Sequence, residues 1–67
     1  MANLGEDFPK MQARTRELLA TYKALPGGVG AFGAMMIEGV LQRADRAAVS
    51  GDVAAMIRSY REMEECK

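Results

Sequence analysis

The sequence predicts an all-α protein in which an N-terminal helix is followed by an antiparallel helical hairpin. Apolar residues recur at steps of three and four in three separate segments, as one face of a helix requires. Glycine and proline separate the segments, and no alternation of apolar and polar residues indicates a β-strand. Because the chain has only 67 residues, we expect a single small helical domain.

The first helix is expected over residues 8–25. Its apolar face comprises Phe8, Met11, Thr15, Leu18, Tyr22 and Leu25. Asp7 is the expected N-cap, and Pro9 fits a first helical turn because the amide hydrogen that proline lacks has no partner there. Pro26 then ends the helix and opens a glycine-containing joint over residues 26–32.

A second helix is expected over residues 33–49, with Val29 as the alternative start. Small residues are frequent on it: Gly33, Ala34, Gly39, Ala44, Ala47 and Ala48. A glycine such as Gly39 in a helix interior costs about 1 kcal/mol relative to alanine. The small residues therefore predict that another helix approaches this one closely.

A turn over residues 50–52 joins the second helix to a third, expected over residues 53–65. Gly51 can adopt the left-handed conformation that closes a helix. Asp52 can accept a hydrogen bond from an amide two or three residues further on, and thereby cap the third helix. Because the turn is this short, the two helices are predicted to form an antiparallel hairpin.

The chain carries more apolar surface than three short helices can bury among themselves. Hydrophobic residues make up 49% of the sequence and include six methionines, whereas a domain of this size buries only a modest share of its surface. The single cysteine, Cys66, excludes an intrachain disulfide, and the absence of histidine argues against a zinc site. We therefore expect no metal or cofactor, and we expect the protein to be a homo-oligomer.

Charge and hydropathy argue against several classes of protein. Nine basic residues balance nine acidic ones, so no overall field attracts DNA or an anionic membrane. The apolar stretches are shorter than the roughly 20 residues that span a bilayer. Residues 1–10 also lack the basic start and the apolar block of a signal peptide. We expect a soluble, cytoplasmic protein that binds neither DNA nor membranes.

The glycines of the joint, in the segment PGGVGAFG, allow two interpretations. Gly28, Gly30 and Gly33 would let a phosphate approach the backbone amides at the start of the second helix. However, the segment lacks the lysine and the hydroxyl residue of a P-loop, and it follows a helix rather than a strand. A hinge with close helix packing is therefore favoured, and an anion site is the alternative.

The hairpin allows two pairs of arginines to converge on one flank. Each pair has a spacing of three residues, and the four are Arg43, Arg46, Arg58 and Arg61. Guanidinium groups match the geometry of phosphates and carboxylates, and Phe32 or Tyr60 would supply a ring that stacks on a nucleobase. The alternative is a solvated helix face on which these arginines have acidic neighbours.

The residue types that most often carry catalysis are scarce in this chain. The sequence has no histidine, and the thiol of Cys66 has acidic neighbours that disfavour a thiolate. No combination of acid, base and nucleophile can be assigned by role. The sequence therefore predicts a protein that is not an enzyme.

The stretch GAFGAMMIEGVLQRADRAAVSGDVAAMIRSYREM, from Gly30 to Met63, resembles small helical proteins that tailed phages and prophages encode in accessory gene clusters. The shared pattern is a glycine- and alanine-rich helix entry, the middle LQRADRAA, the turn SGDVAAMI and a short amphipathic end. The resemblance implies a non-enzymatic, oligomeric protein. Several such families block a bacterial defence protein or sequester the cyclic nucleotide that activates it, and the sequestering ones hold their ligand at multimer interfaces. A phage-encoded protein of this kind would act in the host cytoplasm.

Three functions are compatible with these observations. The first is sequestration of a small anionic, cyclic-nucleotide-like signal at protomer interfaces, with backbone access at the glycines, charge from the arginines and stacking on Phe32 or Tyr60. The second is a protein–protein inhibitor or adaptor that offers a methionine-rich helical face to a host protein. The third is a structural accessory protein without a ligand. We favour the first.

Overall fold

The computed structural model describes residues 3–66, which form three α-helices. Helix α1 spans Leu4–Lys23, α2 spans Ala31–Ser50 and α3 spans Val53–Glu65, and a short 3₁₀ turn, η1, lies at Pro26–Gly28. No β-strand occurs in this part of the chain, which confirms the predicted all-α class.

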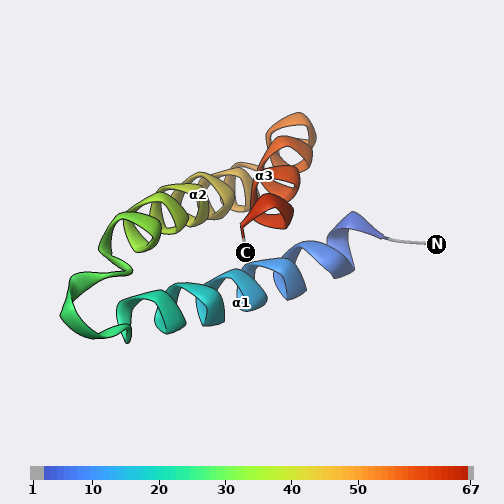
Figure 1. Cartoon of the computed structure of the whole chain (residues 1–67). Coiled ribbons are helices and arrows are strands. Elements are labelled where there is room, and N and C mark those ends of the chain that lie inside the picture. The colour runs from blue at the N-terminus through green and yellow to red at the C-terminus, as the bar shows by residue number, and fades with distance from the viewer. Residues whose placement is uncertain (1–2, 67) are drawn as a thin grey trace.

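Helices α1 and α2 lie side by side, and α3 returns from the end of α2 toward the middle of α1 (Figure 1). Three ion pairs join the helices: Arg16–Asp45 (2.7 Å) and Lys23–Glu38 (3.4 Å) between α1 and α2, and Arg43–Glu62 (2.9 Å) between α2 and α3. Along α1 and α2 the residue numbers rise on one helix as they fall on the other, so this pair is antiparallel. The third ion pair places α3 against the C-terminal half of α2, as the predicted hairpin requires.

The N-terminal end of α1 differs from the prediction. The helix begins at Leu4, and its N-cap is Asn3, whose side-chain oxygen accepts a hydrogen bond from the amide of Gly5 at 2.9 Å. Asp7 lies inside the first turns and is not the cap, so that prediction was wrong. The earlier start brings Leu4 against the hydrophobic core. It also places Pro9 inside the helix and beyond its first turn, so the predicted position of Pro9 was wrong. At its other end α1 stops at Lys23, two residues before the predicted end.

The turn between α2 and α3 is formed by the two residues that the sequence identified. Gly51 has φ 71°, the left-handed conformation, and its amide donates to the carbonyl of Ala47 at 3.0 Å. The carboxylate of Asp52 accepts from the amide of Ala55 at 3.2 Å and caps α3. Both predictions are confirmed, and each rests on hydrogen bonds within a few residues.

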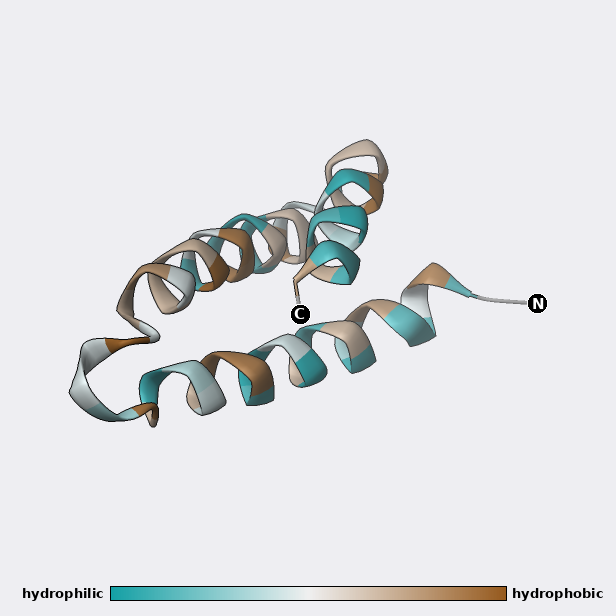
Figure 2. Cartoon of the chain, in the orientation of Figure 1, coloured by the Kyte–Doolittle hydropathy of each residue, from teal (hydrophilic) through white to brown (hydrophobic). Residues whose placement is uncertain are grey.

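The hydrophobic core lies on one side of α2. Eight apolar residues are buried among those described: Phe8, Ala34, Ile37, Val40, Leu41, Ala44, Ala47 and Met63. Six of them belong to α2, whereas α1 contributes one and α3 contributes one. Figure 2 shows the same asymmetry, since hydrophobic residues are concentrated along α2 and hydrophilic ones are more frequent on α1 and α3. The other two helices therefore serve mainly to cover α2.

The glycines of the joint have two different structural roles. Gly27 and Gly28 have φ 68° and 72°, conformations that other residues rarely adopt, and they turn the chain between α1 and α2. Gly30 and Gly33 instead let α2 approach Tyr22. A Cβ atom at Gly33 would lie 2.5 Å from Cε2 of Tyr22, and one at Gly30 would collide with the Tyr22 carbonyl oxygen. Close helix packing thus accounts for two glycines of this segment and turn geometry for the other two.

We expect Gly30→Ala and Gly33→Ala each to destabilise the fold by about 1–3 kcal/mol, as at other overpacked sites. The added methyl group would collide with the Tyr22 carbonyl oxygen in Gly30→Ala and with the Tyr22 ring in Gly33→Ala. In a Tyr22→Ala background the ring is gone, so Gly33→Ala should become neutral or stabilising by up to about 1 kcal/mol, because alanine favours a helix. Gly30→Ala should remain destabilising, since the carbonyl is still present. Urea unfolding midpoints measure both effects, and a Gly33→Ala cost that persists without the ring would contradict this account.

Candidate functional site

The structure brings four predicted arginines to the border of one shallow depression over α2 and α3, which we call the arginine surface. Its members are Arg43, Arg46, Arg58 and Arg61. The first two project from the C-terminal half of α2 and the last two from the middle of α3, at a spacing of three residues on each helix. Residues three apart share a helix face, and the hairpin turns both faces to the same side.

Most of the positive charge on the arginine surface is uncompensated. Arg43 is paired with Glu62, with Nη2 and Oε2 2.9 Å apart, and Arg46 places Nε 3.5 Å from the carbonyl oxygen of Gln42. Within residues 3–66, neither Arg46, Arg58 nor Arg61 forms an ion pair with a carboxylate. The predicted alternative, a face on which arginines and acids neutralise each other, therefore applies to one of the four.

Small residues form the floor of this depression, which keeps it open. Ala47 and Ser59 are buried where α2 and α3 meet. The hydroxyl of Ser50 donates to the carbonyl of Ala47 at 3.1 Å and accepts from the amide of Asp52 at 3.3 Å, so it is already used in the turn. An anion bound here would consequently be held by the guanidinium groups, which donate in pairs to phosphate or carboxylate oxygens.

The other predicted site residues do not lie near the arginines. Gly28, Gly30, Phe32 and Gly33 are at the opposite end of α2, and Phe32 lies fourteen residues before Arg46, or about 21 Å along the helix axis. Tyr22 fills the space beside Gly30 and Gly33. Within one chain, the site predicted from glycines, arginines and an aromatic ring is thus split into two halves.

Tyr60, the second aromatic candidate, is not free on the arginine surface. Its side chain is half-buried and packs against the hydrophobic core. Phe32, by contrast, is 72% exposed. Of the two rings, Phe32 is the one available for stacking.

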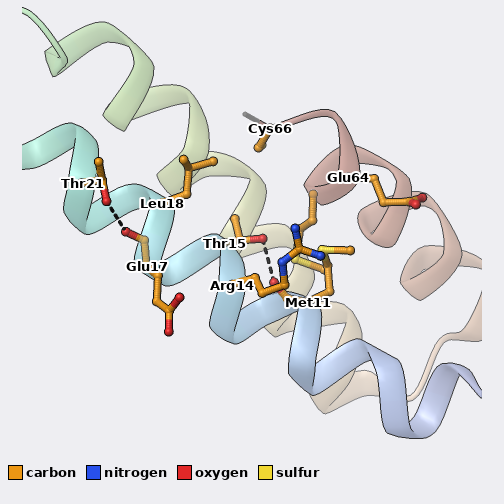
Figure 3. A pocket seen from close by; sticks show the side chains of 9 residues that line it. Met11, Arg14, Thr15, Glu17, Leu18, Thr21, Glu64 and Cys66 are labelled. Carbon is orange, nitrogen blue, oxygen red and sulfur yellow. Dashed lines mark hydrogen bonds between the residues drawn. The ribbon is translucent and has the colours of Figure 1, made fainter.

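A groove between α1 and the end of α3 was not predicted (Figure 3). Arg14 of α1 and Glu64 of α3 lie on its two sides, and Met63 is at its base. The hydroxyls of Thr15 and Thr21 are bonded to backbone carbonyls of their own helix, at 2.7 and 3.1 Å. The groove arises where two helices distant in sequence meet, so no local pattern could have indicated it, and its mixed charges favour no particular ligand.

Cys66 lies at the edge of this groove. Its Sγ donates to the carbonyl oxygen of Glu62 at 3.4 Å. Burial, followed by the charges of Glu62 and Glu65, raises the pKa of the thiol. The thiolate that a nucleophile requires is therefore disfavoured, as the acidic neighbours in the sequence had indicated.

A second exposed feature, which we call the apolar end, surrounds the joint and the start of α2. It consists of Leu25, Val29, Phe32, Met35 and Met36, of which Val29 is 79% and Phe32 72% exposed. No residue from Ala24 to Ile37 carries a charge. α3 does not reach the apolar end, because it has 13 residues against 20 in α2 and lies against the C-terminal half of α2. Phe32 and Met35 also face away from the core, where α3 would not cover them.

The overall dimensions also indicate incomplete burial. The radius of gyration is 12.3 Å, whereas a compact domain of this length has about 11 Å. The accessible surface is 4713 Å², against about 4,200 Å² for a compact monomer of this mass. The chain thus leaves more surface open than a monomer of its size usually does.

Comparison with protein-family models, with curated proteins and with solved structures found no match. In the described part of the chain, no group of three or more potential metal ligands is close enough to hold an ion. None of the described helices is both long and apolar enough to cross a membrane. The candidate site therefore rests on the geometry of the arginine surface and of the apolar end.

The raised pKa of Cys66 predicts slow alkylation. At a pH near 8, iodoacetamide should modify the folded chain several-fold more slowly than the urea-unfolded chain, because the folded state holds less thiolate. Glu65→Gln removes one of the charges that raise the pKa and should increase the folded rate, whereas Glu64→Gln, beside it, should not. Mass spectrometry of the time course gives the rates across pH. Equal midpoints of the pH–rate profiles for the two variants would refute the electrostatic cause.

Proposed function

We propose that this chain is a non-enzymatic binding protein that holds a small nucleotide-like polyanion on the arginine surface. The observation that supports this most directly is the position of Arg46, Arg58 and Arg61 around one depression, without a carboxylate partner among the described residues. Like charges held together repel one another in the free protein, and a polyanion relieves this repulsion.

A ligand with several phosphates fits the arrangement better than a single small anion. The four guanidinium groups project from two helices, so one phosphate cannot engage all of them with good geometry. Cyclic dinucleotides and trinucleotides carry phosphates at separated positions, together with bases that can stack. The resemblance of Gly30–Met63 to phage proteins that sequester such signals supports the same class of ligand, and it extends the proposal to counter-defence in a host cytoplasm.

Binding should appear as a ligand-dependent rise in melting temperature. At a free concentration 100-fold above the Kd, a cyclic dinucleotide or trinucleotide should add about 2.7 kcal/mol to the free energy of unfolding. The double variant Arg58→Ala/Arg61→Ala should lose this shift, because it removes two unpaired arginines from the surface. Lys10→Ala/Arg14→Ala removes the same charge from α1 and is the matched control.

Calorimetric titration at several salt concentrations then separates specific binding from general attraction. The affinity of the parent chain should fall as salt rises, since the contacts are ionic. Absence of binding across a panel of cyclic nucleotides, or an equal loss in the Lys10→Ala/Arg14→Ala control, would refute the proposal. Nucleosides without phosphate serve as the ligand control.

The second candidate function is a protein–protein inhibitor or adaptor, and the apolar end favours it. Phe32, Met35 and Met36 are each more than half exposed and lie on consecutive turns of α2. Methionine side chains are flexible and adapt to differently shaped partners, and exposed apolar patches frequently mark interaction sites. In this candidate the arginines at the other end of α2 favour a partner that also carries an acidic surface.

This second function predicts that the apolar end stays open until the foreign partner arrives. A hydrophobic dye such as anilinonaphthalene sulfonate should then fluoresce with the folded chain at micromolar concentration. Phe32→Glu should abolish the fluorescence without changing the circular dichroism spectrum, because the side chain is 72% exposed. Val49→Glu, at a site that is 90% exposed at the other end of α2, is the control. A folded chain that binds no dye would argue against an open docking face.

A further inference from the structure

We infer that the outer face of α2 is a self-complementary seam, on which a second copy of the chain packs antiparallel with the two-fold axis at Gly39. The seam runs from Phe32 to Arg46, on the side of α2 that faces away from the core. Its N-terminal half is apolar and its C-terminal half is cationic. The pairing itself does not depend on the proposed function, although one consequence of it does.

No contact within a single chain explains why residue 39 is a glycine. Gly30 and Gly33 are needed because Tyr22 would collide with a side chain, and Gly27, Gly28 and Gly51 have positive φ. At Gly39 a Cβ atom would meet only Nη1 of Arg43, at an ordinary contact distance of 3.6 Å.

Glycine nevertheless weakens a helix interior, and Gly39 lies in the middle of α2. Another helix that crosses closely at this point accounts for the missing side chain. A shallow depression between α2 and Lys23 of α1 also extends to Gly39, where Met35 and Gln42 border it.

Apolar residues before Gly39 and arginines after it lie at equal distances from it along α2. Phe32 lies seven residues before Gly39 and Arg46 seven residues after it, and Met35 and Arg43 lie four residues before and after. A two-fold axis at Gly39 therefore sets Phe32 against the partner's Arg46 and Met35 against the partner's Arg43. Each apolar side chain of one copy meets an arginine of the other.

These contacts would give partners to side chains that are exposed in a single chain. A guanidinium group over the face of an aromatic ring is attracted to it, and the arginine stem covers apolar surface at the same time. Arg46 has no carboxylate partner among the described residues, although its Nε is bonded to the carbonyl oxygen of Gln42, and Phe32 is 72% exposed. The antiparallel direction also keeps the two Arg46 side chains about 21 Å apart along the axis, beyond the screening length of about 8 Å at physiological salt.

A second copy fits this face better than an unrelated partner does. On this face each apolar residue has an arginine at the same distance on the other side of Gly39. Pairing with a second copy requires this symmetry, whereas binding to a different protein does not. A parallel pairing would set Phe32 against Phe32 and Arg46 against Arg46, and would leave the charges unpaired. The open surface and the large radius of gyration of the single chain are consistent with a missing neighbour.

The pairing would also rejoin the two halves of the candidate site, a consequence that rests on the proposed function. In one chain, Phe32 is too far from Arg46 to act with it on a ligand. In the pair, the partner's Phe32 lies at the edge of the arginine surface. A nucleobase could then stack on the ring while the phosphates contact Arg58 and Arg61.

The test is site-directed cross-linking in a Cys66→Ser background, without ligand. Met36 and Gln42 are exposed, lie three residues before and after Gly39, and take no part in the arginine surface. A short thiol-reactive cross-linker should join Met36→Cys chains to Gln42→Cys chains in an equimolar mixture. Neither single variant should cross-link with itself to a comparable extent. Light scattering of the parent chain should give the mass of a dimer or of a multiple of it.

Gly39→Leu is the matching loss variant. It should weaken self-association at least about tenfold while the melting temperature at low concentration is unchanged or higher, because leucine favours the helix. Ala48→Leu, at an exposed position on α2 outside the seam, is its control. A parent chain that stays monomeric, self-cross-linking of Met36→Cys alone, or undiminished association of Gly39→Leu would each overturn the inference. Nucleotide binding by a monomer would overturn the seam and leave the proposed function intact. A cross-linked dimer that binds no nucleotide would overturn the proposed function and leave the seam intact.

Discussion

The structure is governed by the shape of the apolar surface on α2, which two neighbouring helices can cover only in part. α2 supplies six of the eight buried apolar residues, and α1 and α3 lie against the same side of it. α1 is as long as α2 and runs beside it, whereas α3 has 13 residues and reaches only its C-terminal half. What α3 leaves uncovered is the apolar end. Part of the exposed hydrophobic surface thus follows from a difference in helix length, and Phe32 and Met35 add to it because they face away from the core.

The position of α1 depends on the contact between Tyr22 and the glycines after the joint. The Tyr22 carbonyl occupies the place of a side chain at Gly30, and its ring occupies that of Gly33, so α1 can fold back closely on α2. The same contact decides between the two interpretations of the glycine-rich segment as far as packing is concerned. Tyr22 thus explains why residues 30 and 33 are glycine, and the anion site at the start of α2 stays a prediction.

The sequence predicted features that follow from helical spacing and from the turn between α2 and α3, and it did not predict features that depend on tertiary packing. The turn at Gly51 and Asp52 was predictable because both residues act through hydrogen bonds to their neighbours. The convergence of the arginines followed from helical spacing and a two-residue turn. The start of α1 was misplaced, because Asn3 and Asp7 are equivalent as caps until the packing of Leu4 is known. The groove between α1 and α3 depends on tertiary packing, which a single sequence does not contain.

Zero net charge conceals an uneven distribution of charged side chains over the chain. Residues Ala24–Ile37 are uncharged, and three arginines that follow lack carboxylate partners in the described chain. Each of these surfaces is unfavourable alone, the first because apolar groups meet water and the second because like charges repel. A polyanion would relieve only the second, and a foreign apolar partner only the first. A second copy placed antiparallel on α2 covers Phe32 and Met35 and sets Arg46 against an aromatic ring, so the arrangement of residues around Gly39 carries more weight than the number of arginines.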